Sequence, residues 1–145
     1  MNSLFPKEKI VFDLPDAEIE YYPNLFSAEK SNELFLKLKN EIPWQQDNIT
    51  VFGQTYPQPR LTALYGNDGK TYSYSNIVMQ PHKWNPLLMF IKNEVEEICP
   101  ENFTTVLLNQ YRDGKDSNGW HADNEKELGR NPIIASISFG AERVF

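Results

Sequence analysis

The sequence predicts an α+β domain, and three observations support that prediction. Apolar residues recur at helical spacing in two segments, near residues 28–42 and 86–98, whereas residues 103–111 alternate with the period of two that is typical of a strand. Hydrophobic residues make up 40% and charged residues 23% of the chain, which is the balance of a globular protein. A chain of 145 residues can bury one hydrophobic core, so we expect a single domain.

The first half of the chain is predicted to begin with an extended segment and a helix. Residues 17–26 are expected to be extended, Ser27 is placed to cap the helix that follows, and Pro43 ends that helix. The spacing of Leu34, Phe35, Leu38 and Ile42 gives the helix one apolar face. Two strands, a turn and a further strand arm are predicted next, at residues 49–52, 61–65, 66–69 and 71–77.

The second half is predicted to hold another helix and then strands. Asn85-Pro86 is a favourable helix start, with an asparagine cap and a proline in the first turn, and Pro100 closes the helix. Residues 103–111 form the next predicted strand. A loop, an extended segment, a last strand and a turn are expected at residues 113–114, 120–123, 133–139 and 140–141.

Cysteine content and hydropathy bound the compartment. Cys99 is the one cysteine, so no intrachain disulfide can form and a reducing compartment is expected. We expect Cys99 to be a small buried residue at a helix end. No run approaches about 18 apolar residues, and residues 1–16 lack the apolar core of a secretory signal. The sequence therefore predicts an intracellular protein with no membrane partner, cytoplasmic in a bacterium and nuclear in a eukaryote.

The net charge of −6 argues against sequence-independent nucleic-acid binding, which needs a basic surface. The acidity is uneven along the chain. Residues 1–50 carry nine acidic and five basic residues (−4), residues 51–100 carry four of each (0), and residues 101–145 carry seven and five (−2). The middle third is therefore the least repulsive to a polyanion.

His121-Ala122-Asp123 is the strongest candidate for a metal site. In an extended segment, side chains two apart point the same way, so this histidine and aspartate can present a nitrogen and an oxygen to one ion. Two histidines and one carboxylate on one face of a metal form the facial triad of non-haem Fe(II) oxygenases. Alone, the His-x-Asp spacing is a weak signal in a chain with 20 acidic residues.

Asn109 and Tyr111 share one face of the predicted strand that precedes this motif. An amide and a phenol beside a metal are suitable hydrogen-bond donors to a ligand that bears a carboxylate. The alternative is an ordinary strand pair with polar tips.

Three segments of the last third resemble, in their order and spacing, the AlkB family of Fe(II)- and 2-oxoglutarate-dependent dioxygenases, which repair alkylated nucleobases. They are residues 109–114 (NQYRDG), 119–125 (GWHADNE) and 131–140 (NPIIASISFG). The likeness is nearly continuous from residue 59 to residue 145, and it is greatest to family members that act on duplex DNA. It implies an α+β fold with a double-stranded β-helix (jelly roll) core and N-terminal helices packed on it.

The resemblance also implies roles for individual residues. His121 and Asp123 would be iron ligands and catalytic residues, and Asn109 and Tyr111 would bind 2-oxoglutarate. The substrate would contact the hydrophobic finger, the nucleotide-recognition lid and two residues near the flipped base: Phe52, Gly53, Arg60, Tyr72, Ser73, Tyr74, Ser75, Asn124 and Glu125. An apolar fingertip can replace lost base stacking. The alternatives are that Phe52 is a core strand residue and that Tyr72 and Tyr74 pack one face of a sheet.

The family pattern needs a second metal histidine and arginines that grip 2-oxoglutarate, all after the His-x-Asp segment. His82 does not match the ligand position, and we expect it to be a surface loop residue. The chain is therefore predicted to be a single incomplete domain, truncated at its C-terminal end, although a natural edge strand at that end is the alternative. Its parts are an N-terminal extension with a helix, a lid and the start of the jelly-roll core, at residues 1–48, 49–80 and 103–145.

The function implied by the resemblance is oxidative demethylation of 1-methyladenine and 3-methylcytosine in DNA repair, with release of formaldehyde. The expected cofactors are Fe(II), 2-oxoglutarate and O₂. The expected partner of this monomer is DNA with alkylated bases, with duplex favoured and single strands or RNA possible. Two alternatives stay open: a dioxygenase of the same fold that acts on a substrate other than nucleic acid, and a non-catalytic module that binds damaged bases.

Overall fold

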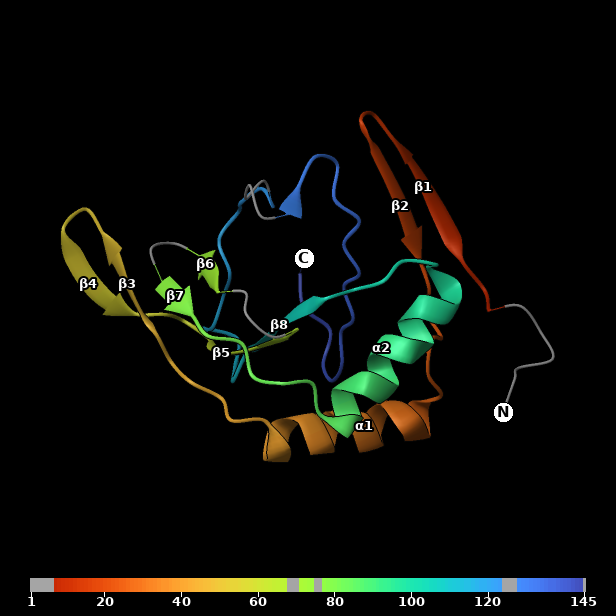
Figure 1. Ribbon diagram of the computed structural model, residues 1–145, viewed down its shortest axis with the longest axis horizontal. Coiled ribbons are helices and arrows are strands. Elements are labelled where there is room, and N and C mark those ends of the chain that lie inside the picture. The colour runs from red at the N-terminus through yellow and green to blue at the C-terminus, as the bar shows by residue number, and fades with distance from the viewer. Residues whose placement is uncertain (1–6, 68–70, 75–76, 124–127, 145) are drawn as a thin grey trace. The chain divides into compact units, whose positions relative to one another are not determined.

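The computed structural model describes residues 7–67, 71–74, 77–123 and 128–144 (Figure 1). The chain divides into two compact units: one comprises Met1–Leu36 with Ser138–Phe145, and the other comprises Lys37–Ile137. Helices and antiparallel strands occur together, so the predicted α+β class is confirmed. No helix in the described ranges combines the length and the apolar character that crossing a membrane requires.

The first unit contains a β-hairpin made of β1 (Ile10–Leu14) and β2 (Ala17–Tyr21). The strands pair in the register Phe12↔Ile19, so most apolar side chains share one face, whereas the acidic side chains and Val11 lie on the other. Only the second strand falls in the segment predicted to be extended. The first strand escaped prediction because its partner, and not its own composition, decides its conformation.

Helix α1 spans Ala28–Glu41 and confirms the predicted boundaries. The Ser27 hydroxyl oxygen accepts a hydrogen bond from the Lys30 backbone N–H at 3.1 Å, which satisfies one of the N–H groups that a helix start leaves without a partner. Leu34, on the apolar face of the helix, is buried.

In the second unit, β3 (Asn48–Val51) and β4 (Gln54–Pro57) form a hairpin that projects from the rest of the unit (Figure 1). Seven of its eight strand residues are exposed. Strand β3 was predicted one residue later in the chain, at residues 49–52, and β4 was not predicted. A loop of two residues joins the strands, and the hydrogen bonds between the two strands hold the hairpin.

The core of the second unit is built around β5 (Leu61–Gly66) paired with β8 (Thr105–Gln110). Ala63, Leu64 and Tyr65 are buried in β5. The register pairs Thr62 with Asn109, so residues far apart in the sequence lie side by side. Both strands were predicted, with β8 shorter by two residues at its start and by one at its end.

Helix α2 (Pro86–Ile98) follows the predicted cap. Asn85 Oδ1 accepts a hydrogen bond from the Leu88 backbone N–H at 2.8 Å, and Leu88, Ile91 and Val95 form the buried face. Cys99 is the C-cap and is half-buried, whereas we expected it to be buried. The reason is its position at the last turn, where the buried stripe of the helix ends.

Two sequence predictions about strands were wrong. Residues 71–77 were predicted to form one arm, but β6 (Tyr72–Tyr74) pairs with a separate strand, β7 (Ile77–Met79), in antiparallel register. Residues 133–139 form no strand, because no described segment provides hydrogen bonds along them, and Ile133 and Ile134 are exposed. The sheets among the described residues are four separate antiparallel pairs, so the two facing sheets of a jelly roll are not evident in them.

Candidate metal and cofactor site

The structure brings His121 and Asp123 together at the end of a loop that follows β8. His121 Nε2 lies 3.4 Å from Asp123 Oδ1, and both side chains are partly exposed. Two atoms that each lie about 2.1 Å from one metal ion at a right angle are about 3.0 Å apart. The observed pair is therefore close to the separation that a shared ion requires.

A backbone hydrogen bond sets the orientation of the His121 ring. Nδ1 lies 2.7 Å from the carbonyl oxygen of Gly119, and because a carbonyl only accepts, Nδ1 carries a proton. In the neutral imidazole, Nε2 is then unprotonated and faces the Asp123 carboxylate. This is the usual arrangement of a metal-binding histidine, whose second ring nitrogen donates to a carbonyl or carboxylate. The two side chains fit an Fe(II) ion as two of its ligands.

No cluster of three or more His, Cys, Asp or Glu side chains suited to a metal occurs within the part of the chain that the structure describes. The other histidine, His82, is exposed, as predicted, and its ring lies 5.2 Å from the ring of Tyr65. Its backbone pairs with β5 through hydrogen bonds to Leu64 and Gly66. Within the described residues, the candidate metal site therefore consists of two side chains, His121 and Asp123, which we call the metal arm.

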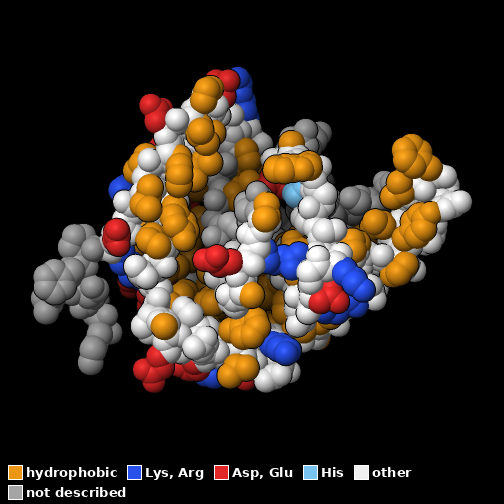
Figure 2. All heavy atoms as spheres, turned by 180° about the vertical axis from the view of Figure 1, so that it is seen from behind, with side chains coloured by type: hydrophobic (Ala, Val, Ile, Leu, Met, Phe, Trp, Pro, Cys, Tyr) orange, Lys and Arg blue, Asp and Glu red, His pale blue; other side chains and the backbone are white. Residues whose placement is uncertain are grey.

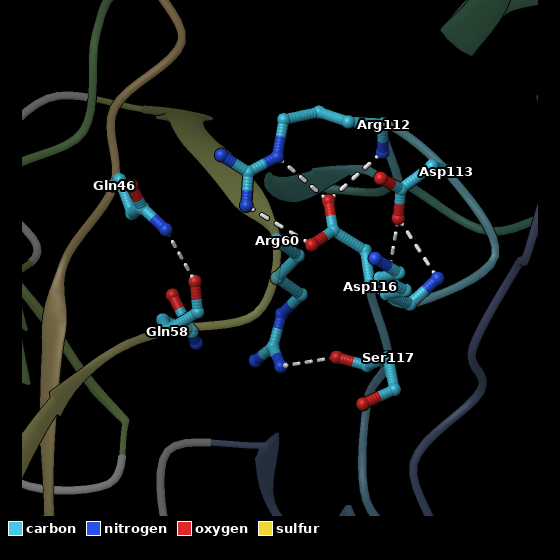
Figure 3. A network of polar contacts seen from close by, with 8 residues as sticks. Gln46, Gln58, Arg60, Arg112, Asp113, Asp116 and Ser117 are labelled. Atoms are coloured by element: carbon cyan, nitrogen blue, oxygen red, sulfur yellow. Dashed lines mark hydrogen bonds and ion pairs between the residues drawn. The ribbon is translucent and has the colours of Figure 1, made fainter.

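Asn109, the predicted 2-oxoglutarate contact, is held by Arg60 across the β5–β8 pair. Arg60 Nε donates to Asn109 Oδ1 at 2.9 Å, and Arg60 Nη1 donates to the carbonyl oxygen of Ser117 at 3.4 Å. Figure 3 shows this guanidinium reaching from the start of β5 to the Ser117 carbonyl. Arg60 is only 4% exposed, so its charge depends on such hydrogen bonds for stabilisation. The sequence predicted Arg60 as a substrate residue, and that role stays a prediction.

The loop between β8 and His121 is closed by an ion pair that the sequence analysis missed. Arg112 Nε and Nη2 donate to the two carboxylate oxygens of Asp116 at 2.8 and 3.0 Å, and the Arg112 backbone N–H adds a third bond at 2.9 Å (Figure 3). The hydrogen bond that Arg112 donates to Asp116 raises the pKa of Arg112 above its ordinary value. The sequence signal that could have indicated this ion pair is a basic and an acidic residue four positions apart in a predicted loop.

Three further hydrogen bonds hold this loop. Asp113 Oδ1 accepts hydrogen bonds from the backbone N–H groups of Lys115 and Asp116, at 2.8 and 3.3 Å, as in an Asx turn (Figure 3). The Ser117 N–H donates to the carbonyl of Pro59 at 2.8 Å. The segment that leads to His121 is therefore attached to the start of β5.

Phe52 and Gly53 form the two-residue tip of the β3–β4 hairpin, and the Phe52 side chain is fully exposed. The alternative that Phe52 is a core residue is therefore wrong. Both residues have positive φ, +49° and +77°, which is the signature of a type I′ turn. Val51 and Tyr56 add exposed apolar surface to this hairpin, the projecting arm on the right of Figure 2.

The remaining predicted residues are placed as follows. Tyr111 directly follows β8 and is half-buried, and Ser73 is exposed in β6. The backbone of Tyr72 and Tyr74 lies in β6, opposite Met79 and Ile77. Ser75, Asn124 and Glu125 lie outside the described residues. The metal arm, Asn109 and the hairpin tip thus belong to one unit, Lys37–Ile137.

Comparison with known proteins identifies the family of the chain. The model of the 2OG-Fe(II) oxygenase superfamily matches residues 18–145, which is most of the chain. The chain therefore belongs to the 2OG-Fe(II) oxygenase superfamily, and its similarity to the proteins described next makes it a member of the AlkB type.

Curated relatives carry AlkB names. The chain is 44% identical over 124 residues to the alpha-ketoglutarate-dependent dioxygenase alkB homolog 3 of Bos taurus, which covers 85% of this chain and 43% of the relative. It is 44% identical over 125 residues to the Homo sapiens protein of that name, covering 86% and 43%. It is 38% identical over 127 residues to the DNA oxidative demethylase ALKBH2 of Homo sapiens, covering 86% and 49%. The chain spans less than half the length of these relatives.

Proposed function

We propose that this chain is part of an Fe(II)- and 2-oxoglutarate-dependent dioxygenase that removes methyl groups from 1-methyladenine and 3-methylcytosine in DNA and releases formaldehyde. The observation that carries the proposal is the convergence of His121 Nε2 and Asp123 Oδ1 at 3.4 Å, with the ring anchored through Nδ1. The relatives include proteins named as dioxygenases and as DNA oxidative demethylases. A role in DNA repair follows from restoration of the unmodified base.

In this proposal the chain's residues bind and orient the reactants. His121 and Asp123 hold Fe(II), and Asn109 and Tyr111 hold 2-oxoglutarate beside it. When bound, iron and 2-oxoglutarate together activate O₂ to hydroxylate an N-methyl group. The protein contributes the positions of the groups and the exclusion of competing reactions. The loop closed by Arg112 and Asp116 keeps the His121 segment in place.

The exposed hairpin tip supports DNA, and duplex DNA in particular, as the substrate. Phe52 has a large, fully exposed apolar side chain and a backbone conformation that favours asparagine or glycine. A strained and exposed apolar residue is more easily explained by a function than by stability. Inserted between base pairs, the phenyl ring would fill the gap left by a flipped base, at a cost of about a few kcal/mol per unstacked step.

The other parts of the proposal concern charge and architecture. Both substrates are cationic bases, which suits a site lined by tyrosine and by a carboxylate such as Glu125. We also propose that residues 103–145 begin a jelly-roll core, that residues 49–80 form the lid, and that the protein acts as a monomer inside the cell. The acidity of the chain lies mostly in residues 1–50, away from these segments.

A demethylation assay tests the function. The protein is incubated with a duplex that carries one 1-methyladenine, and mass spectrometry follows the loss of one CH₂ from the strand. We expect a loss that requires both Fe(II) and 2-oxoglutarate and that is abolished by His121→Ala. The matched control is Lys115→Ala, which lies in the loop before His121 and has no part in the proposed chemistry. This variant should retain activity.

A second comparison separates the substrate classes. Phe52→Ala should slow demethylation of the duplex more than that of a single strand, because only the duplex has a stack to be filled. If wild-type protein consumes 2-oxoglutarate but leaves methylated DNA and RNA intact, a substrate other than nucleic acid is indicated and the proposal is wrong. If it binds methylated DNA without consuming 2-oxoglutarate, the non-catalytic alternative holds.

A further inference from the structure

The buried arginine at the start of β5 has a geometry that bears on how the cofactor is bound. Arg60 lies one residue before β5, and its side chain crosses to Asn109 on β8. The register pairs Thr62 with Asn109, and Arg60 is two residues before Thr62. Because side chains two apart on a strand share a face, Arg60 is a diagonal neighbour of Asn109 on that face.

The hydrogen bond determines which way the Asn109 amide points. An arginine N–H can only donate, so the Asn109 atom that faces Arg60 Nε at 2.9 Å is the oxygen. The amide NH₂ group of Asn109 then points to the other side. An amide whose oxygen had no such donor could turn over and present its oxygen to a ligand instead.

The second contact of Arg60 sets the orientation of the guanidinium. Nη1 donates to the carbonyl of Ser117 at 3.4 Å. The Ser117 N–H in turn donates a hydrogen bond to the carbonyl oxygen of Pro59, the residue before Arg60. Because the guanidinium is planar and rigid, fixing one N–H direction fixes the others. The burial of Arg60 at 4% exposure removes competing water from these bonds.

We propose that Arg60 is a positioning residue for 2-oxoglutarate: it locks Asn109 with its NH₂ group outward, as a donor to a carboxylate oxygen of the cosubstrate. This inference rests on the proposed function. An amide that presented its oxygen would repel a carboxylate. Because Arg60 holds the oxygen of Asn109, the amide presents its NH₂ group to a ligand, and this group can donate only to an acceptor such as a carboxylate oxygen. The positive charge of Arg60 also polarises the amide and strengthens its N–H groups as donors.

Binding of 2-oxoglutarate to the Mn(II)-loaded protein tests the inference without turnover, with isothermal titration calorimetry as the readout. We expect Arg60→Met to raise the Kd of 2-oxoglutarate about tenfold, the loss that follows when one well-placed hydrogen bond is removed. The matched control is Arg130→Met, which removes an exposed arginine of the same unit that lies outside the β5–β8 pair and the loop leading to His121. Its Kd should stay within about twofold of wild type.

A double-mutant cycle shows whether Arg60 acts through Asn109. In an Asn109→Ala background, Arg60→Met should change the Kd by less than about twofold, because the group that it positions is gone. An equal tenfold effect in both backgrounds would overturn the inference and indicate a direct or purely structural role. An unchanged Kd in Arg60→Met alone would overturn it as well.

A measurement on unaltered protein covers the case in which Arg60→Met does not fold. In ¹⁵N-labelled protein loaded with diamagnetic Zn(II), the Arg60 Nε–H signal should be protected from exchange with water and should shift when 2-oxoglutarate is added. Arg60→Lys, which keeps the charge, identifies the signal by its loss. A signal that exchanges freely or ignores 2-oxoglutarate overturns the inference. Wild-type protein that does not bind 2-oxoglutarate at all overturns the proposed function together with it.

Discussion

Two antiparallel strand pairs of the same unit differ in almost every property. The β3–β4 hairpin pairs neighbours in the sequence, carries seven exposed residues out of eight, and ends in an uncovered phenylalanine. The β5–β8 pair joins segments about forty residues apart in the chain, buries most of β5, and holds Asn109 through Arg60. The difference teaches that local pairing suffices to expose an apolar tip, whereas the orientation of a polar side chain such as Asn109 is fixed by long-range pairing and burial.

The largest expected effect is on the buried pair. Leu64 in β5 is 1% exposed, so Leu64→Ala should lower the free energy of unfolding by about 2–5 kcal/mol, through lost burial and the cavity that remains. Tyr56→Ala in the exposed hairpin should cost no more than about 1 kcal/mol. Urea unfolding of both variants makes the comparison. Equal losses would mean that the hairpin is as much a part of the core as β5.

The two pairs also use glycine for different reasons. A Cβ atom on Gly66, at the end of β5, would lie 3.2 Å from the Thr104 carbonyl oxygen and 3.3 Å from Thr105 Oγ1. Gly66→Ala should therefore destabilise the protein by about 1–3 kcal/mol through crowding. Gly53 has open space around it and needs only its positive φ, so Gly53→Asn should cost less than about 1 kcal/mol. Urea midpoints of the two variants test the contrast, and a Gly66→Ala protein as stable as wild type would contradict it.

The hairpin tip should become more stable when its apolar residue is removed. Phe52 has a φ of +49°, where asparagine is better tolerated than phenylalanine. Phe52→Asn is therefore expected to raise the free energy of unfolding by about 1 kcal/mol and, at the same time, to slow demethylation of duplex DNA. Thermal unfolding and the duplex assay measure the two effects. A loss of stability would indicate that the phenyl ring packs on the protein.

The smallest expected effect is a pH dependence near the start of β8. Glu96 accepts a hydrogen bond from the Phe103 N–H at 2.9 Å, and the hydrogen bond from Lys92 is the main reason that the pKa of Glu96 is lowered below its ordinary value of 4.5. Because the folded-state pKa is the lower one, this contribution is present above pH 4.5 and is lost as the pH falls through the folded-state pKa.

Amide hydrogen exchange at Phe103 measures this loss. The quantity to follow is the ratio of the Phe103 N–H protection factor in wild type to that in Glu96→Gln. This ratio should decline below pH 4.5, whereas for amides of β3 and β4 it should be the same at every pH. A constant ratio at Phe103 would show that the carboxylate does not hold the backbone there.

Local signals in the sequence were sufficient for part of the fold. The helix caps at Ser27 and Asn85 follow from side-chain chemistry within a few residues, and both hydrogen bonds are present. Strands β5 and β8 were recognisable from their apolar pattern. Strands β1 and β4 were not, because their residues are exposed and the partner strand specifies them. Strand β7 was not separated from β6, although Met79 in β7 is buried.

The candidate site divides in the same way. The spacing of His121 and Asp123 predicted that the two side chains point the same way, and the structure places Nε2 and Oδ1 3.4 Å apart; their role as metal ligands stays a prediction. The Arg112–Asp116 pair and the contact of Arg60 with Asn109 were not predicted. A hydrogen bond between residues 49 positions apart has no sequence signature without the register that brings them together.

By itself, the sequence determined the α+β class, the helix boundaries, the family and the spacing of the metal arm, since each depends on neighbouring residues or on an ordered set of motifs. The tertiary structure alone decided that Phe52 is exposed on a strained turn and that Arg60 is buried against Asn109. The physical reason is that burial and amide orientation are properties of the environment, which long-range strand pairing creates, and one residue type can meet either environment.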